Sequence, residues 1–202
     1  VGRAFLVAVG AWPLIKGRER VPASGPLVVV ANHTSFLDGL LILVLMPRSV
    51  RFVAKNTLER SWIGPLLRHL GTLFVERFDV RKGAESTAQI RQSVMAEEAV
   101  VFFPEGTFGR MPGLLPFRMG AFVVAAETGA RVLPVGLRGL RTMLRSGSWF
   151  PRRAAVSLSV GNPVTQNSGG WEAAIGLRDA ARAELLHHSG EADLRFETGE
   201  VE

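Results

Sequence analysis

Short apolar runs that alternate with longer helix-like segments limit the fold of this chain more than any other feature. Leu27–Ala31 is almost wholly apolar and rich in β-branched residues, and Gly25-Pro26 directly before it marks the start of a strand. Similar runs predict strands at 50–54, 71–77, 99–103, 130–137 and 154–160, and the segments between and after them predict helices at 37–46, 57–70, 82–98, 117–128 and 171–188. We therefore expect an α/β fold, a single domain with a mixed, largely parallel sheet flanked by helices and with its functional loops at the carboxyl ends of the strands.

Two prolines interrupt this pattern. Gly64-Pro65 should break or kink the predicted helix at 57–70. Pro134 falls inside the predicted strand at 130–137, where a bulge or an edge position explains it without any chemical role.

The length suits one domain. The chain has 202 residues, 47% of them hydrophobic, which is enough for one buried core and too few for two. We expect an N-terminal segment at 1–20, a folded domain at 21–188 and an acidic tail or linker at 189–202. The first segment is mostly apolar with basic flanks, which is typical of an interfacial helix or the stub of a membrane anchor, and a core helix is the alternative. No apolar run reaches the roughly 18–20 residues that span a bilayer.

The composition excludes several kinds of site. There is no cysteine, so disulfides, thiolate metal sites and a cysteine nucleophile are ruled out, and an intracellular location is favoured. The four histidines lack metal-ligand spacing, so we expect no metal.

The charge is uneven along the chain. The net charge is +6, and the residues before Ser189 carry +10 because the tail carries −4. A domain this basic is attracted to anionic surfaces, either phospholipid headgroups or nucleic acid. Part of the charge lies in one stretch with two aromatic residues, which suits an anionic membrane or the phosphates of coenzyme A, although solvated arginines are the default. The arginines of this stretch are Arg138, Arg141, Arg145, Arg152 and Arg153.

A histidine and a carboxylate stand where the first predicted strand ends. His33 follows that strand, and Asp38 lies in the first turn of the helix that comes next, which Thr34 or Ser35 can cap. A carboxylate five residues away across such a turn can accept a hydrogen bond from one imidazole nitrogen, and the other nitrogen is then left to accept a proton. The alternative is a turn histidine and an aspartate that merely favours a helix N-terminus.

Further motifs follow in chain order. They are Lys55 with Gly64-Pro65 and Gly71-x-x-Phe74-Val75-x-Arg77, then Phe103-Pro104-Glu105-Gly106-Thr107 after a strand, then the strand at 130–137. Together with Asn32-His33-x-x-x-x-Asp38 they resemble the four signature blocks of the glycerolipid acyltransferases, the family of the 1-acylglycerol-3-phosphate acyltransferases. The third block resembles the family most closely.

The resemblance assigns roles to the first two blocks. His33 and Asp38 would be the catalytic pair, and Arg77 and Lys55 would hold the phosphate of the acyl acceptor. A cation at the end of a buried strand is costly unless it finds an anion, which favours a ligand role. The alternative is surface cations that pair with Glu59 or Glu76.

In the third block, Gly106 would let the backbone approach the substrate, and Thr107 offers a hydroxyl donor. Glu105 would bind the acceptor hydroxyl or orient Arg77 or Arg118, and an ordinary turn is the alternative for the whole block. Many relatives place arginine directly after the threonine, whereas this chain has Phe108 there and Arg110 two residues later. Either Arg110 or Arg118 is therefore a candidate to complete the phosphate site.

The resemblance also implies a reaction. A fatty acyl group would move from acyl-CoA or acyl-ACP to the free hydroxyl of a lysophospholipid, most simply 1-acylglycerol-3-phosphate to give phosphatidic acid, with no cofactor beyond the acyl donor. We expect an anionic membrane surface rather than nucleic acid as a partner, and a membrane-associated location on the cytoplasmic face. The rival interpretations are another lysolipid acceptor, a lipid hydrolase with the same pair, and a non-catalytic membrane-binding domain.

Overall fold

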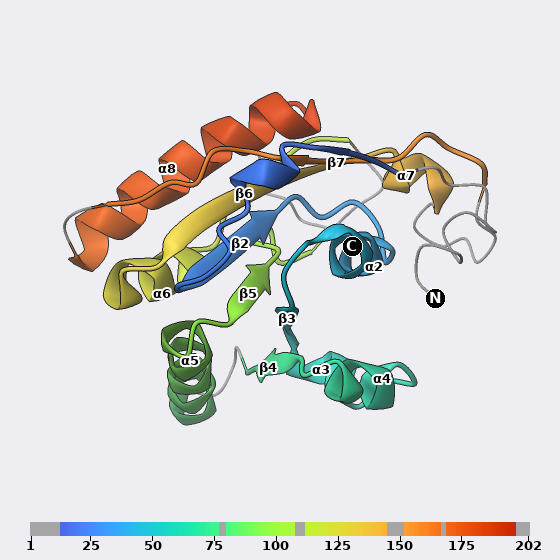
Figure 1. The fold of residues 1–202 in the computed structure, drawn as a ribbon. Helices are drawn as coiled ribbons and strands as arrows, with labels where there is room; N and C mark the ends of the chain where they lie inside the picture. The colour runs from blue at the N-terminus through green and yellow to red at the C-terminus, as the bar shows by residue number, and fades with distance from the viewer. Residues whose placement is uncertain (1–12, 77–79, 108–111, 145–151, 167–168, 197–202) are drawn as a thin grey trace.

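A mixed sheet forms the middle layer of the protein in the computed structural model, which describes residues 13–76, 80–107, 112–144, 152–166 and 169–196 (Figure 1). Within these residues the sheet has seven strands in the order β1-β7-β6-β2-β5-β3-β4. The strands β6, β2, β5, β3 and β4 are mutually parallel, β7 is antiparallel to β6, and β1 is parallel to β7. Their bounds are β1 Leu14–Lys16, β2 Leu27–Ala31, β3 Val50–Lys55, β4 Leu73–Val75, β5 Ala99–Phe102, β6 Arg131–Arg138 and β7 Ser157–Val160.

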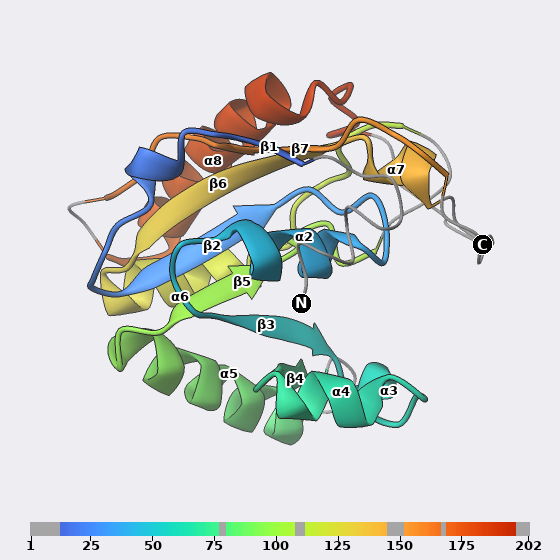
Figure 2. The same ribbon diagram turned by 45° about the vertical axis from the view of Figure 1, so that its right-hand side comes forward.

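Helices cover both faces of this sheet, as predicted. Figures 1 and 2 show α5, α6 and α8 on one face and α2 on the other. The helical segments are η1 Arg18–Arg20, α2 Asp38–Leu45, α3 Asn56–Glu59, α4 Gly64–His69, α5 Val80–Met95, α6 Gly120–Thr128, α7 Leu140–Met143 and α8 Gly170–Ser189.

The central strand β2 is buried from both sides. Val28 and Val30 pack into the apolar cluster under α5, α6 and α8, whereas Val29 and Ala31 pack into the cluster under α2. All five residues of β2 are 0% exposed, which explains why the run is apolar throughout instead of alternating. The residues after β2 are therefore held at the centre of the carboxyl edge of the sheet.

One predicted element is interrupted as expected, and another differs from the prediction. The predicted helix at 57–70 is broken into α3 and α4, as Gly64-Pro65 indicated, and Pro65 lies in the first turn of α4, where a proline needs no hydrogen-bond partner for its nitrogen. Leu14–Lys16 forms a strand beside β7, so the prediction of a helix is wrong for these residues, while residues 1–12 lie outside the described part. Of the helices that the structure describes, none is both long and apolar enough to span a bilayer.

Pro134 lies inside the sheet at an irregularity in strand pairing. On one side of it Val135 pairs with Val160, and on the other side Val132 pairs with Val164, so the partner segment contains one extra residue. This is the arrangement of a β-bulge, where a residue without an N–H is tolerated. The bulge interpretation of this proline is confirmed.

The segment after α8 folds back onto the domain. The N–H of Leu114 donates to the carbonyl of Ala192 at 2.8 Å, and the N–H of Leu194 donates to the carbonyl of Leu114 at 3.1 Å. Within the predicted acidic tail at 189–202, Ser189 is the last residue of α8, Ala192 and Leu194 are therefore bonded to Leu114, and residues 197–202 lie outside the described part.

Candidate active site

The histidine and aspartate meet in the turn between β2 and α2. Nδ1 of His33 lies 2.9 Å from Oδ2 of Asp38, so the predicted contact is formed. The side chain of Asp38 is 0% exposed and that of His33 is 20% exposed. Because a carboxylate only accepts hydrogen bonds, we assign a proton to Nδ1, which leaves Nε2 with its lone pair as the basic nitrogen.

Asp38 also closes the turn that carries the histidine. Its carboxylate accepts hydrogen bonds from the N–H of Thr34 at 2.5 Å, the N–H of Ser35 at 2.9 Å and the hydroxyl of Thr34 at 3.1 Å. The N-cap residue of α2 is Leu37, which makes no side-chain cap bond, and of the two predicted capping residues Ser35 accepts the N–H of Leu37 with its hydroxyl at 3.4 Å. Asp38 reaches back to the turn instead, so one carboxylate fixes both the imidazole and the main chain around it.

Two neighbouring side chains, to which the sequence motifs assigned no role, fix the turn further. The ring of Phe103, just after β5, stacks on the imidazole of His33 with centroids 4.2 Å apart and planes at 20°. The buried amide of Asn32 accepts from the N–H of Leu137 at 2.7 Å and donates to the carbonyl of the same residue at 3.0 Å. The sequence could have pointed to both residues, because Asn32 lies inside the first motif and Phe103 inside the third.

Glu105 connects the third motif to the first. It is 5% exposed, its Oε1 accepts the N–H of His33 at 2.7 Å and its Oε2 accepts the N–H of Leu115 at 2.8 Å. Burial raises the pKa of Glu105 to about 7, against the lowering effect of these two hydrogen bonds. The sequence predicted a ligand for the substrate or for an arginine, whereas both carboxylate oxygens here hold the main chain.

The rest of the third motif forms a tight turn. Gly106 has a φ of +73°, and its N–H donates to the carbonyl of Phe103 at 2.9 Å. A residue with a side chain is strained at this φ, so the turn alone requires glycine. Thr107 is half-buried directly after it. Arg118 has its N–H bonded to the carbonyl of Pro104 at 2.9 Å and its side chain exposed.

The second motif lies at the same edge of the sheet. Lys55 is the exposed last residue of β3, and it pairs in register with Val75, the last residue of the parallel strand β4. Arg77 follows two residues after β4 and, like Arg110, lies outside the described residues. Because the carboxyl ends of parallel strands meet at one edge, the topology brings the segments after β2, β3, β4 and β5 to that edge, as predicted.

Part of the predicted basic stretch has a structural role. The guanidinium of Arg138 donates to the carbonyls of His188 and His187 at 2.7 and 3.1 Å, at the end of α8. Arg141 forms an ion pair with Glu191 at 3.0 Å. Arg152 and Arg153 are exposed, and Arg145 lies outside the described part.

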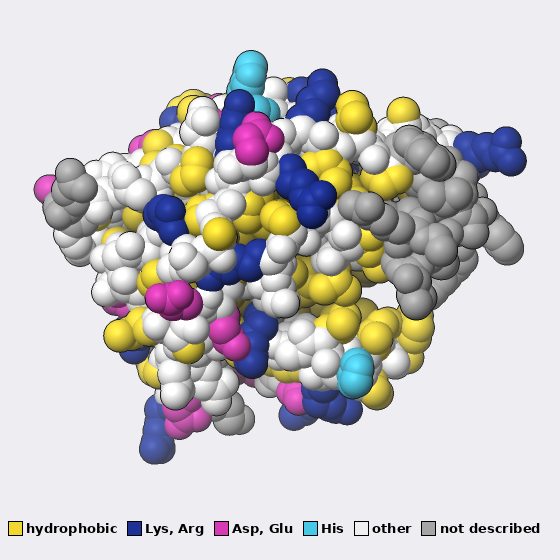
Figure 3. Space-filling view, in the orientation of Figure 1, with side chains coloured by type: hydrophobic (Ala, Val, Ile, Leu, Met, Phe, Trp, Pro, Cys, Tyr) yellow, Lys and Arg dark blue, Asp and Glu magenta, His cyan; other side chains and the backbone are white. Residues whose placement is uncertain are grey.

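Apolar side chains are exposed in the catalytic turn between β2 and α2 and in the segment at 62–66. Phe36, within the turn between His33 and Asp38, is 67% exposed, and Trp62, between α3 and α4, is 79% exposed. Leu66 on α4 is also exposed. Figure 3 shows hydrophobic side chains gathered over the face that carries α2, α3 and α4.

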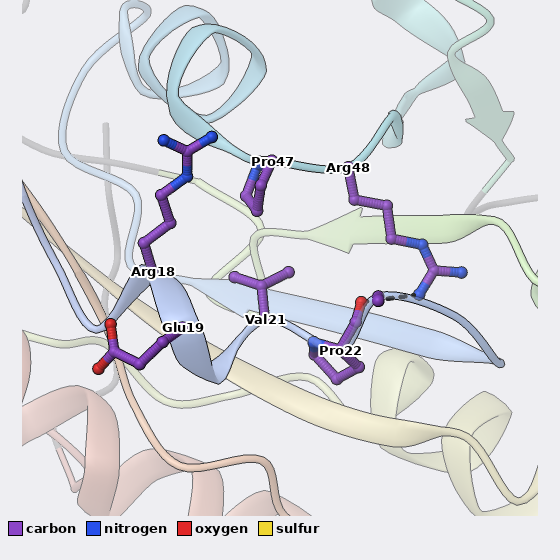
Figure 4. Close-up of a pocket in the computed structure, with 7 residues that line it drawn as sticks. Arg18, Glu19, Val21, Pro22, Pro47 and Arg48 are labelled. Atoms are coloured by element: carbon purple, nitrogen blue, oxygen red, sulfur yellow. Dashed lines mark hydrogen bonds between the residues drawn. The ribbon is translucent and has the colours of Figure 1, made fainter.

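A separate hollow of about 600 Å³ lies between η1 and the loop after α2 (Figure 4). Its lining residues precede β2 and β3, so it lies at the amino edge of the sheet, opposite the candidate site. The guanidinium of Arg48 in its wall donates to the carbonyls of Pro22 and Gly25 at 3.4 and 2.8 Å, which joins the two loops. The described residues contain no group of three or more His, Cys, Asp and Glu side chains that could hold a metal ion.

The geometry defines a class of protein, an α/β domain in which a partly exposed histidine pairs with a buried aspartate at the carboxyl edge of the sheet. The sequence model of the Acyltransferase family matches residues 13–138. The chain belongs to this family, which confirms the resemblance drawn from the four motifs.

Relatives and a solved structure agree with this membership. The chain is 35% identical over 136 residues to a chloroplastic 1-acyl-sn-glycerol-3-phosphate acyltransferase of Brassica napus, covering 66% of this chain and 39% of the relative. It is 33% identical over 140 residues to a 1-acyl-sn-glycerol-3-phosphate acyltransferase of Neisseria meningitidis, covering 68% and 53%. The chain thus spans about half or less of the length of these relatives.

The fold is similar to that of the 1-acyl-sn-glycerophosphate acyltransferase of Thermotoga maritima. The two structures align with a TM-score of 0.77 and 25% identity, over 94% of this chain and 75% of the other.

Proposed function

We propose that this chain transfers a fatty acyl group from a thioester donor, acyl-CoA or acyl-ACP, to the free hydroxyl of 1-acylglycerol-3-phosphate and so produces phosphatidic acid. The observation that carries the proposal is the contact between His33 and Asp38 at the carboxyl edge of the sheet. The names of the relatives support the choice of acceptor.

In the proposed reaction, Nε2 of His33 accepts the proton of the acceptor hydroxyl as its oxygen attacks the thioester carbonyl. The tetrahedral intermediate then expels the thiolate, which takes the proton back from the imidazolium and leaves as the free thiol. Asp38 stabilises the imidazolium, because its buried carboxylate lies 2.9 Å from Nδ1. Proton transfer of this kind contributes roughly 10²–10⁴-fold to the rate, and the positioning of the two substrates contributes much of the remainder.

The acceptor phosphate binds, in this proposal, to the basic residues of the second and third motifs. Arg77 and Lys55 follow adjacent parallel strands, so the register of β3 with β4 supports a common role. Arg110 or Arg118 completes the phosphate site, and Gly106 and Thr107 line the approach of the glycerol. Glu105 holds the loop, since both of its oxygens accept main-chain hydrogen bonds.

The membrane is the proposed source of the acceptor. The exposed apolar side chains around α2 and α4 suit contact with lipid, and the positive charge suits anionic headgroups. We place the protein in association with the cytoplasmic face of a membrane, with no role for nucleic acid and no cofactor other than the acyl donor.

The experiment that tests the proposal measures phosphatidic acid formed from oleoyl-CoA and 1-acylglycerol-3-phosphate in mixed micelles. Product should require both substrates. Arg77→Ala should raise the KM for the phosphorylated acceptor and have little effect with 1-acylglycerol, which lacks the phosphate. Arg18→Ala, which removes an exposed arginine at the opposite edge of the sheet, is the matched control. An equal loss with both acceptors would refute the phosphate role, and fatty acid release without acceptor would support a hydrolase.

A further inference from the structure

A buried arginine on α8 contacts the segment at 113–115, which is hydrogen-bonded to Glu105. Arg182 is 2% exposed, and its guanidinium donates to the carbonyls of Leu114 and Leu115, each at 2.6 Å. It also donates to the carboxylate of Asp193 at 2.5 Å and lies 4.7 Å from the centroid of the Phe117 ring. A buried cation is tolerated only when it is paired and hydrogen-bonded, and these contacts satisfy both conditions.

Two of the partners of Arg182, Leu114 and Leu115, belong to the short segment at 113–115, which residues after α8 also hold. The carboxylate of Glu191 accepts the N–H of Gly113 and also pairs with Arg141. Together with the main-chain bonds of Leu114 to residues 192–194, these contacts fix the position of the segment at 113–115. The guanidinium of Arg182 holds the pKa of Asp193 below its usual range, which keeps this partner ionised.

Leu115 connects Arg182 to the catalytic turn through hydrogen bonds. Its carbonyl accepts from Arg182, and its N–H donates to Oε2 of Glu105 at 2.8 Å. The other oxygen of Glu105 accepts the N–H of His33 at 2.7 Å. A continuous series of hydrogen bonds therefore runs from α8 through Leu115 and Glu105 to the main chain of His33.

We infer that Arg182 is a positioning residue for His33, which acts through Leu115 and Glu105 without touching the substrates. The inference rests on the proposed function for its kinetic effect. When Arg182 is removed, the segment at 113–115 loses two contacts to its carbonyls, and the N–H of Leu115 that donates to Glu105 is no longer held in place from α8. A misplacement of about 1 Å in a catalytic group lowers a rate by about a hundredfold, so a loosened Glu105 should lower kcat more than it changes the acceptor KM.

The test compares Arg182→Met with Leu185→Ala. Leu185 is 0% exposed on the same helix and packs in the apolar cluster, so its truncation lowers stability without removing a hydrogen bond to the segment at 113–115. Arg182→Met should lower kcat by about tenfold or more, with the acceptor KM nearly unchanged and with faster hydrogen exchange at the amide of His33. Leu185→Ala should leave kcat and the exchange rate at the amide of His33 near those of the wild type, although it should lower the unfolding free energy by a comparable amount.

The inference is overturned if the two variants have the same kcat and the same exchange rate at His33. If Arg182→Met does not fold, Arg182→Lys serves in the same comparison, because lysine keeps the charge but cannot reach two carbonyls and a carboxylate in one fork. The exchange measurement needs no catalysis. An inactive wild type would therefore count against the proposed function, and the exchange rates would still decide the role of Arg182.

Discussion

Replacing Asp38 by asparagine separates its catalytic role from its structural one. Oδ2 of Asp38 accepts three hydrogen bonds, from the N–H groups of Thr34 and Ser35 and from the imidazole of His33, and Oδ1 accepts one from the hydroxyl of Thr34. The amide oxygen of asparagine can take the place of Oδ2. Its NH₂ group then faces the hydroxyl of Thr34, which can accept. Asp38→Asn should therefore fold.

The expected losses differ in size. Hydrogen bonds to a charged acceptor contribute about 1 kcal/mol more each than those to a neutral one, so the three at Oδ2 predict a stability loss of roughly 1–3 kcal/mol. The catalytic loss is larger, because the neutral amide at position 38 no longer stabilises the imidazolium of His33. This side chain is fully buried, so water does not screen the missing charge. We expect kcat to fall by about 10²–10⁴-fold, which corresponds to roughly 3–5 kcal/mol of transition-state stabilisation.

Steady-state acyl transfer gives kcat, and urea denaturation of the same preparations gives the unfolding free energy. Asp38→Ala is the control for the structural role, since it leaves the buried N–H groups of Thr34 and Ser35 without their acceptor and should destabilise the domain more than Asp38→Asn does. A folded Asp38→Asn protein with kcat within about threefold of the wild type would refute the reasoning, because general-base alignment contributes at least 10²-fold in this account.

Three further changes test the surroundings of the pair. Folding raises the pKa of Glu105 from 4.5 to about 7, so the folded protein binds this proton more tightly than the unfolded protein does. The stability that proton binding to Glu105 contributes is therefore fully present below pH 4.5 and is lost as the pH rises through about 7. The loss is roughly 3 kcal/mol, and urea denaturation from pH 4.5 to 8 should show it in the wild type but not in Glu105→Gln. Asn32→Ala leaves the buried N–H and C=O of Leu137 without partners, so the unfolding free energy should fall by about 2–4 kcal/mol; an unchanged denaturation midpoint would show that the bridge is dispensable. Phe103→Leu keeps an apolar contact but removes the stacking on His33, worth about 0.5–1.5 kcal/mol, and circular dichroism melting should detect a small drop while kcat falls by a few fold.

Local features of the site could be predicted from the sequence. The pairing of His33 with Asp38 spans five residues across one turn, so the spacing alone limits their separation. The continuous apolar run of β2 indicated a strand covered on both faces, and the alternation of elements indicated a largely parallel sheet with its loops at one edge.

The contacts between distant segments could not be predicted. The hydrogen bond from His33 to Glu105 spans 72 residues, and that from Asn32 to Leu137 spans 105. Hydrophobic periodicity says which side of an element is buried but not which strand is its neighbour, so the motifs could be placed at one edge without their mutual bonds. For Glu105 the sequence accordingly indicated a ligand for the acceptor hydroxyl or for an arginine, and it did not indicate the two main-chain hydrogen bonds.

The burial and pairing of some charged residues could not be predicted for a similar reason. Arg182 lies on a helix among many other charges and is indistinguishable in sequence from a solvated arginine, yet its side chain is buried. The acidic composition after Ser189 is typical of a tail or linker, but Glu191 and Asp193 pair with Arg141 and Arg182. The strand at Leu14–Lys16 is too short to show an alternation, so its apolar neighbours suggested a helix instead.

The most direct test of the central claim is the release of free thiol from oleoyl-CoA by the wild type and by His33→Ala, each with and without 1-acylglycerol-3-phosphate. We predict thiol and phosphatidic acid in equal amounts from the wild type only when the acceptor is present, and a rate at least about 10²-fold lower from a folded His33→Ala protein. Turnover by His33→Ala at the wild-type rate would contradict the assignment of His33 as the base. Thiol release by the wild type at the same rate without acceptor would contradict acyl transfer to a lipid hydroxyl.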